Sequence, residues 1–420
     1  MKIGTYGGIC NNGYVMARAL AENDVDVLHI RARDPMDLFP FNQPSWNDVP
    51  QILPYQQVYA PWLWPQWAQR EKELSWNSPK WMTDPFLHVA DAGTVHVDSR
   101  VGQFVGHCVE NLRRNPHWAA AVTAMRGCDG LIVSGIAGVL LAWMSGKPFI
   151  AWPHGMDIRQ AVGMNPPEQE QGDANPLLVA AFGAAECIAS HSPTSGACYG
   201  DPLPALGQRL EYLPWPAPTS TRLPKPDRRK LLGMLLAEMR VGFHDAETIV
   251  FVPSRVDFLW KGQDRLADEY KGRDDIHFIF SGWGGDLPKL REMMPDATFL
   301  PFAVSRPILR DLFRAADVAV DEFKSGEYGS GLVDAAACGC PVVTHIDRER
   351  YAAKEMLPPP VADTVDAAVE MEGRIASWAS NRHSEEVFAR RVREIFRGLV
   401  APKDEAANRT RAERTASAKA

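Results

Sequence analysis

Two cations stand close together in the second half of the chain, near the predicted start of a helix. The run VPSRVDFLWKGQDRL places Ser254 and Arg255 directly after a predicted strand, and Lys261 with Gly262 at the start of the helix. A helix amino terminus offers unpaired N–H groups and the positive end of a dipole, so this arrangement suits a bound diphosphate. Taken alone, the run favours the simpler interpretation of two cations solvated at a strand end and a helix end.

A glycine-rich loop follows in the same half of the sequence. The run ADVAVDEFKSGEYGSGLVDAAACGCPVV predicts a strand, a loop with Gly326, Gly329 and Gly331, a helix from about Ser330, and a further strand. Loop glycines permit positive φ and a close approach of the backbone to a ligand. A carboxylate in the first helical turn, here Asp334, can accept hydrogen bonds from the hydroxyls of a ribose.

Two segments of the first half contain candidates of the same kind. GTYGGICNNG places Gly7 and Gly8 in the turn after the first predicted strand, where the backbone can come close to a ligand. FIAWPHGMDIR places His154 after another predicted strand, with Asp157 just behind it. The alternatives are an ordinary strand-to-helix turn and a histidine that is satisfied within a loop or the core.

The elements that must position these residues alternate between short apolar runs and amphipathic runs, which is the pattern of βαβ units in a parallel sheet. In the first half, strands are predicted at residues 2–6, 25–30, 131–134, 148–152, 187–190 and 210–213, and helices at 14–21 and 101–112. In the second half, strands are predicted at 248–253, 277–281, 298–300, 318–321 and 341–344, and helices at 263–270, 287–293, 307–314 and 332–338. A last helical pattern at 364–399 is long enough to pack back across the other domain. The sequence therefore predicts an α/β protein of two doubly wound domains, which bind ligands at the carboxyl ends of their strands.

A proline-rich stretch separates the two series. Five prolines lie within residues 214–226, so we predict a semi-rigid linker there. It divides an amino-terminal domain (1–213) from a carboxy-terminal domain (227–400), and the polar residues 401–420 are expected to form a disordered tail. An irregular region at 39–86 is predicted to be an insertion in the first domain.

Composition narrows the classes of function. The 420 residues include 45 Lys+Arg and 52 Asp+Glu, and a net charge of −7 without a basic stripe argues against nucleic acid as a partner. Seven cysteines without a C-x-x-C pair fit a reducing compartment better than a disulfide framework or a zinc site. The amino terminus shows no export signal, and the apolar stretch at 130–146 is too short to span a membrane. No run matches G-x-x-x-x-G-K-[ST], which disfavours P-loop phosphoryl transfer.

The carboxy-terminal half resembles the retaining, family-4-like glycosyltransferases of the GT-B fold. Four runs carry the resemblance: PSRVDFLWKG, FIFSGWGGD, RPILRDLFRAADVAVDEF and GEYGSGLVDAAACGCPVV. In the first half, it is limited to the glycine turn and the HG-x-D segment. The resemblance implies two Rossmann-like domains that face an interdomain cleft, with a UDP-sugar or GDP-sugar as the donor.

The resemblance also implies roles for individual residues. It makes Arg255 and Lys261 the groups that bind the donor diphosphate and stabilise its charge during catalysis. Asp334 stands where the family has a ribose-binding Glu, and His154 would orient the sugar or the acceptor. The predicted donor-binding residues are Gly7, Gly8, Ser254, Gly282, Gly326, Tyr328, Gly329, Ser330, Gly331, Leu332 and Asp334.

One position departs from the family pattern. The last motif of the family usually begins E-x7-E, and Gly326 occupies the first of these two places. Glu327 is adjacent and is the predicted catalytic substitute. Because the missing Glu usually contacts the donor sugar, the departure leaves the identity of that sugar open, and activity itself as well.

We therefore predict a glycosyltransferase that moves a sugar from a nucleotide-diphosphate donor to a glycan, lipid-linked or small-molecule acceptor, with retention and without a metal. The alternative is a catalytically inactive GT-B relative that binds glycans or partners. A sugar-nucleotide epimerase or a phosphorylase explains the order of the motifs less well. The predicted location is the cytoplasm, with peripheral contact at the inner face of a membrane left open.

Tryptophan is concentrated in the irregular region. Six of the 13 tryptophans lie there: Trp46, Trp62, Trp64, Trp67, Trp76 and Trp81. Trp62 and Trp64, together with Asp157, are the predicted acceptor-binding residues, since aromatic faces stack on sugar rings. The alternative, in which the tryptophans pin a long loop onto the domain, is at least as well supported.

Overall fold

The computed structural model describes residues 1–7, 11–32, 42–55, 64–84, 98–165, 170–194 and 200–400. Three of the sequence-based predictions concern residues outside this set, namely Gly8, Trp62 and the tail 401–420, and the side chain of Trp64 is not described either.

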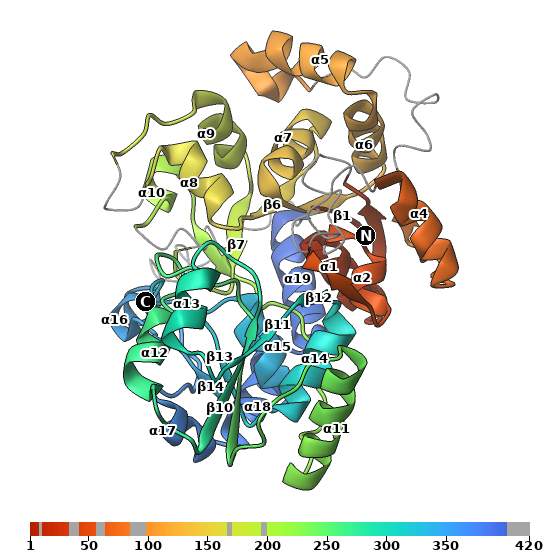
Figure 1. The fold of residues 1–420 in the computed structure, drawn as a ribbon. Helices are drawn as coiled ribbons and strands as arrows, with labels where there is room; N and C mark the ends of the chain where they lie inside the picture. The colour runs from red at the N-terminus through yellow and green to blue at the C-terminus, as the bar shows by residue number, and fades with distance from the viewer. Residues whose placement is uncertain are drawn as a thin grey trace, which may run out of the picture.

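The amino-terminal sheet has seven parallel strands in the described part of the chain, in the order β4-β2-β1-β5-β6-β7-β8 (Figure 1). The strands are β1 (Lys2–Tyr6), β2 (Asp26–Ile30), β4 (Met82–Thr83), β5 (Gly130–Ser134), β6 (Phe149–Trp152), β7 (Cys187–Ser190) and β8 (Leu210–Tyr212). The helices are α1 (Asn12–Ala21), α2 (Ser45–Asp48), α4 (Trp64–Glu73), the 3₁₀ helix η6 (Ser99–Phe104), α5 (Val105–Arg114), α6 (Pro116–Arg126), α7 (Gly135–Ser145), α8 (Met156–Val162), α9 (Pro176–Gly183) and α10 (Leu203–Leu206). The order reverses between β1 and β5, which creates a ligand-binding crevice at their carboxyl ends.

The carboxy-terminal sheet has five parallel strands among the residues described, in the order β11-β10-β9-β13-β14. They are β9 (Thr248–Val252), β10 (Ile276–Ser281), β11 (Thr298–Leu300), β13 (Val318–Val320) and β14 (Val342–Val343). The helices are α11 (Lys225–Glu238), α12 (Asp264–Tyr270), α13 (Leu287–Met293), α14 (Arg306–Ala315), α15 (Ser330–Ala337), α16 (Arg348–Ala353), α17 (Val365–Val369), α18 (Arg374–His383) and α19 (Glu385–Val400). Here the order reverses between β9 and β13.

Every strand predicted from the sequence is present, and each predicted end agrees within one residue. The agreement follows from burial, because all six residues of β10 and all five of β5 are buried, as the apolar runs of a doubly wound sheet require. The last helical pattern, at 364–399, is divided into α17, α18 and α19. It is interrupted around Gly373 and at Ser384, whose backbone is extended.

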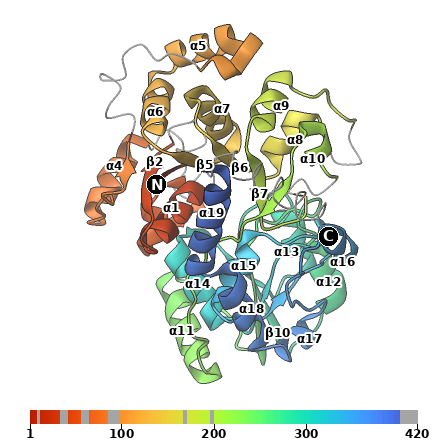
Figure 2. The same ribbon diagram turned by 180° about the vertical axis from the view of Figure 1, so that it is seen from behind.

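The last helix crosses back to the first domain. Helix α19 lies beside α1 (Figure 2), and Phe388, Val392 and Phe396 are fully buried in an apolar cluster that contains residues of both domains. The guanidinium of Arg391 donates to the carbonyl oxygen of Tyr212 at 3.1 Å. The end of the described chain is thus anchored on the amino-terminal domain, as the length of the helical pattern predicted.

The first part of the proline-rich stretch is packed, whereas residues 219, 221 and 224–226 are exposed. Residues 213–217 are buried, and Trp215 retains only 3% of its accessible surface. The backbone N–H of Ala217 donates to the carbonyl of His383 at 2.9 Å, and that of Ser220 donates to Ala337 at 2.8 Å. The two segments that connect the domains therefore lie side by side and hold one another.

The tryptophan-rich region forms an unexpected bridge to the other domain. Its strand β3 (Ile52–Pro54) pairs antiparallel with β12 (Phe302–Val304), which precedes α14 in the carboxy-terminal domain. Hydrogen bonds between Gln51 and Ser305 extend the pairing at one end: the N–H of Gln51 donates to Ser305 Oγ at 2.7 Å. A two-stranded ribbon thus ties the domains together.

The described tryptophans of this region have structural contacts. Trp46 is buried, Trp76 donates from Nε1 to Asp48 at 2.9 Å, and the ring of Trp81 lies 5.3 Å from that of Tyr14. These three fit the interpretation in which tryptophans pin the insertion onto the domain. No helix in the described ranges is long and apolar enough to cross a membrane.

Candidate functional site

A cavity of about 510 Å³ lies between the carboxyl ends of the two sheets. One wall comes from segments that follow β1, β6 and β7, and the opposite wall from segments that follow β9 and β13. The wall residues that the sequence had singled out are His154, Arg255, Lys261, Glu327, Tyr328, Gly329 and Ser330. Folding therefore brings together, in one cavity, side chains from both halves of the chain.

Lys261 occupies the carboxy-terminal wall, in the turn that follows β9. Its Nζ forms an ion pair with Glu322, whose other carboxylate oxygen accepts a hydrogen bond from Ser325 Oγ. Burial by itself lowers the pKa of Lys261, but the carboxylates of Glu322 and Asp321 outweigh it and raise that pKa above its ordinary value. The ammonium is therefore fully charged at neutral pH.

The second cation of this wall is more exposed. The Arg255 side chain keeps 45% of its accessible surface and donates from Nε to Asp257 at 3.1 Å. Across the cavity, the guanidinium of Arg159 lies 4.5 Å from the ring of Trp260, a cation–π contact that joins the two walls.

Two histidines of the amino-terminal wall are held in the same tautomer, with the proton on Nε2, but they leave different ring nitrogens without a partner among the described residues. Asn12 Nδ2 lies 2.9 Å from His154 Nδ1 and donates to it, so the proton of His154 sits on Nε2, which has no partner among the described residues. His191 Nε2 lies 3.2 Å from the carbonyl oxygen of Tyr328, which can only accept. His191 Nδ1 is therefore an unprotonated acceptor, and it too lacks a partner within the described ranges.

Both histidines are neutral near pH 7. Burial lowers the pKa of His154, against a smaller opposing effect of Asp157, and lowers the pKa of His191 to about 4. The cavity thus offers one N–H donor and one nitrogen acceptor, both unsatisfied, on the same wall. A sugar ring with several hydroxyl groups can satisfy both.

Glu327 connects the two walls through one carboxylate oxygen, Oε1, while its other oxygen, Oε2, has no hydrogen-bond partner among the described residues. It is 2% exposed, and its Oε1 accepts hydrogen bonds from Thr194 of the other domain, at 3.0 Å from the N–H and 2.6 Å from the hydroxyl. Arg350 lies 3.6 Å from the same oxygen. An ion pair between Lys354 and Asp201 also spans the domains. Glu327 Oε1 thus clamps the two domains together, and the catalytic role of the Glu327 carboxylate stays a prediction.

Asp334 has a different neighbour from the predicted ribose. Both of its oxygens are taken by Arg306, at 3.1 Å from Nε and 2.6 Å from Nη2, and both side chains are buried. Asp334 does not line the cavity. The predicted ribose contact is therefore replaced in this structure by a bidentate ion pair with a residue of α14.

Several other predicted residues serve the local fold and do not line the cavity. Asp157 accepts from the backbone N–H of His154 at 2.8 Å and so shapes the loop. Gly7 has φ 148°, and a Cβ there would lie 1.9 Å from Ser134 Oγ. Gly326 has φ 68° and would meet Asp347 at 2.9 Å. The predicted residues Ser254, Gly282, Gly331 and Leu332 are also absent from the cavity wall.

Sequence reasoning missed several residues that line the cavity, among them Glu322 and His191. Glu322 pairs with the predicted Lys261, and His191 supplies the bare acceptor nitrogen. Both follow predicted strands directly, β13 and β7, so the rule that ligands bind at the carboxyl ends of parallel strands contains the signal for them.

No protein-family model matches the chain, and no curated protein matches it in sequence. Solved structures do match it over nearly its whole length. HepE from Anabaena in complex with UDP-glucose has a TM-score of 0.52 at 13% identity, with 95% of this chain and 100% of that chain covered. TarM from S. aureus, a variant in complex with Fondaparinux, alpha-GlcNAc-glycerol and UDP, has a TM-score of 0.50 at 9% identity, with 94% and 99% covered. The chain therefore has the GT-B fold, with two Rossmann-like domains, which confirms the predicted fold class.

Proposed function

We propose that the protein is a glycosyltransferase that takes its sugar from a nucleotide-diphosphate donor, a UDP- or GDP-sugar. The proposal rests on one observation: the cations Arg255 and Lys261 line the same interdomain cavity as two neutral histidines on the facing wall. Solved structures of similar fold that contain UDP or UDP-glucose support a nucleotide-sugar donor.

The cations would act on the departing diphosphate. Breaking the bond between sugar and phosphate leaves negative charge on the leaving group, and fixed cations stabilise that charge without reorganising. Lys261 has three N–H donors, so it can retain Glu322 and still donate to a phosphate oxygen. Ser330, at the amino end of α15, adds a backbone N–H group at the same wall, whereas the N–H of Gly329 already donates to Asp321 at 3.1 Å. In this proposal no metal is needed for the leaving group.

The histidines would recognise the sugar. His154 donates from Nε2 to one sugar oxygen, and His191 Nδ1 accepts from a sugar hydroxyl. The acceptor would approach from the amino-terminal domain as a glycan, a lipid-linked sugar or a small molecule, and retention is the stereochemistry that the family resemblance implies. The Glu327–Thr194 clamp helps to exclude water from the reacting bond when the domains are closed.

The proposal is tested by nucleotide binding and by slow donor hydrolysis. The purified chain is titrated with UDP and GDP by calorimetry, and UDP- and GDP-sugars are assayed for nucleotide release in the absence of an acceptor, with and without EDTA. We expect micromolar binding of one nucleotide and EDTA-insensitive release from one of its sugars. Binding without any release supports the inactive relative, and no binding across the panel rejects a nucleotide-dependent function.

A further inference from the structure

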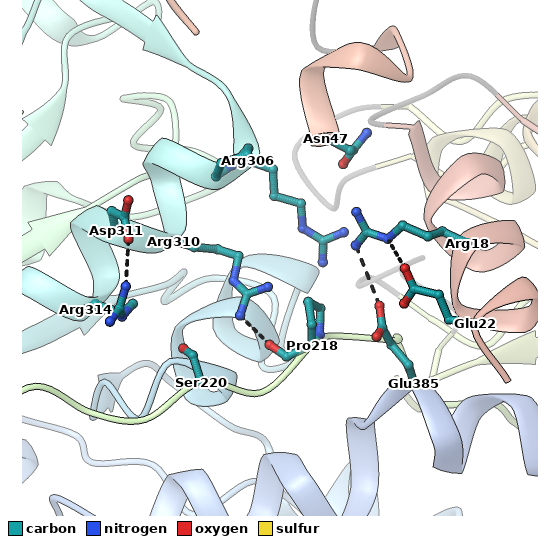
Figure 3. A pocket seen from close by; sticks show the side chains of 11 residues that line it. Arg18, Glu22, Asn47, Pro218, Ser220, Arg306, Arg310, Asp311, Arg314 and Glu385 are labelled. Carbon is teal, nitrogen blue, oxygen red and sulfur yellow. Dashed lines mark hydrogen bonds and ion pairs between the residues drawn. The ribbon is translucent and has the colours of Figure 1, made fainter. Parts of the chain in front are cut away.

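A second cavity, of about 420 Å³, lies at the seam between the domains, beside both connecting segments (Figure 3). It is separate from the cavity that contains Lys261, and no residue is shared between the two walls. Its walls come from α1 and α2 of the first domain, α14 of the second domain, the linker and the first residue of α19. The lining residues are Arg18, Glu22, Asn47, Pro218, Ser220, Arg306, Pro307, Arg310, Asp311, Arg314 and Glu385.

Three guanidinium groups from the two domains converge on this space. In Figure 3, Arg18 on α1 and Arg306 on α14 point toward one another, and Arg310 points into the space from the same helix as Arg306. Arg310 donates to the carbonyl oxygen of Pro218, and Arg18 pairs with Asp48 at 3.2 Å. Like charges that face one another repel, and an anion between them removes that repulsion and adds charge-assisted hydrogen bonds.

Two side chains of the wall that are more than nine-tenths buried, Arg306 and Asn47, each have one donor without a partner among the described residues, and Glu385 Oε1 of the same wall lacks a hydrogen bond as well. Arg306 is 8% exposed, and two of its nitrogens bind Asp334, while Nη1 has no hydrogen bond. Asn47 is 7% exposed, and its Nδ2 is also unsatisfied. Buried donors without a partner are rare because each one costs free energy. Two of them on one cavity wall, from different domains, indicate a ligand that accepts hydrogen bonds.

The acidic residues of the wall form ion pairs with its arginines. Asp311 pairs with Arg314 at 3.0 Å, and Arg18 lies 3.9 Å from Glu22 and 3.6 Å from Glu385. Burial raises the pKa of Glu22, and the neighbouring Glu385 raises it further. In Figure 3 Glu22 lies beside the stem of Arg18, and Glu385 lies below the Arg18 guanidinium, next to Pro218. Carboxylates therefore pair with Arg18, Arg306 and Arg314, whereas Arg310 has no carboxylate partner among the described residues.

We propose that this cavity binds a phosphate group, either free phosphate or the phosphoryl group of a small phosphomonoester. Arg306, Arg310 and Asn47 would hold its oxygens, with Arg18 opposite. Planar guanidinium groups match the spacing of phosphate oxygens, and the cavity volume leaves room for a short organic substituent. The proposal does not depend on the glycosyltransferase function, because the residues are different.

A phosphate held there contacts both domains. It links α1 and α2 to α14 next to the two connecting segments, so bound phosphate stabilises the present arrangement of the domains. The proposal therefore implies that a phosphorylated metabolite regulates the opening of the domains.

Two substitutions remove the contacts while leaving the ion pairs of the wall intact. Asn47→Leu deletes the unsatisfied donor and breaks no hydrogen bond of that side chain in the described structure. Arg310→Gln deletes one of the converging cations. Arg348→Gln is the matched control, since Arg348 is exposed on α16 and lies outside both cavities. Lys261→Met is the control for binding in the other cavity.

The test is calorimetric titration of the full chain with inorganic phosphate and, separately, with glycerol 3-phosphate, at constant ionic strength set with chloride. We expect saturable binding of at least one of them, with affinity lowered about tenfold or more in Asn47→Leu and Arg310→Gln and unchanged in Arg348→Gln and Lys261→Met. Tighter binding of glycerol 3-phosphate identifies a phosphomonoester as the preferred form, and tighter binding of inorganic phosphate identifies the free ion. No saturable binding up to about 10 mM of either probe overturns the proposal. Binding that is lost in Lys261→Met and kept in Asn47→Leu overturns it as well.

Discussion

Replacing Lys261 by methionine is the sharpest test of the cavity between the sheets. Methionine keeps the length of the side chain and removes the charge, so Glu322 loses its cationic partner and keeps the hydroxyl of Ser325. The side chains of Lys261 and Glu322 are 25% and 13% exposed, which places the pair between a surface and a buried ion pair. We expect the free energy of unfolding to fall by about 2 kcal/mol, between the values typical of these two classes.

Nucleotide binding should suffer more than stability. A charge-assisted hydrogen bond to phosphate contributes about 1.5–3 kcal/mol, so UDP or GDP affinity should fall about tenfold to one hundred and fifty-fold. The unpaired Glu322 adds repulsion toward the diphosphate in the single variant. The double variant Lys261→Met/Glu322→Gln removes this repulsion, so part of the affinity should return, and the remaining loss measures the cation alone.

The assay is calorimetry with UDP and GDP at pH 7.5 in physiological salt, on variants whose urea unfolding shows a folded state. Arg348→Gln removes one positive charge from an exposed position and controls for net charge. If the wild type binds a nucleotide and folded Lys261→Met binds it within about twofold of the same affinity, the assignment of Lys261 to the diphosphate is refuted.

Three further predictions concern other buried polar groups. Asp334→Ala leaves Arg306 buried without its carboxylate, so urea titration should show a free energy of unfolding lower by about 3–5 kcal/mol, while nucleotide affinity is kept. If Asp334 bound the ribose instead, nucleotide affinity would fall and stability would be kept. His191→Phe keeps a ring and removes the bare acceptor, so kcat/KM for donor hydrolysis should fall about tenfold while UDP affinity is unchanged; an equal loss for UDP would contradict a role at the sugar. Burial lowers the pKa of His29 to about 3, far below the value near 6.5 of the unfolded chain, so the unfolded state binds the extra proton as pH falls. The stability that neutral His29 contributes is present above pH 6.5, and below that pH it is lost at about 1.4 kcal/mol per pH unit. In His29→Gln, the free energy of unfolding measured with urea should therefore fall less steeply between pH 6.5 and 4, by about 1.4 kcal/mol per pH unit.

The sequence predicted the sheets well because their strands are short apolar runs buried on both faces, and local composition alone marks such runs. It also predicted Arg255, Lys261 and His154, since each lies in a segment that follows a strand and the fold brings such segments together. The sequence did not predict roles that depend on contacts with residues far apart in the chain. Asp334 lies in a helix start where a ribose contact is plausible, and only the three-dimensional structure brings Arg306 to both of its oxygens.

The sequence did not predict the two-stranded ribbon between the domains, for a related reason. Strands β3 and β12 have three residues each, too few for an alternating pattern to be distinguished from a loop, and they are far apart in the sequence. The tryptophans around β3 drew attention to acceptor binding, whereas those that are described, Trp46, Trp76 and Trp81, hold the insertion in place.

The contacts between the domains divide into two kinds, and this division indicates how the cavity opens to admit a donor. On the side of the connecting segments, β3 and β12 share backbone hydrogen bonds, and α19 is buried against α1. Beside the cavity, the domains are held by side chains, above all by the hydrogen bonds of Glu327 with Thr194. Side-chain contacts at a polar cleft break at lower free energy than a paired ribbon flanked by a buried helix. Hydrogen exchange of the wild type should therefore show the amide of Thr194 exchanging before those of residues 52, 53 and 302–304, with UDP or GDP slowing Thr194 most. Earlier exchange at the ribbon would place the opening on the other side of the molecule.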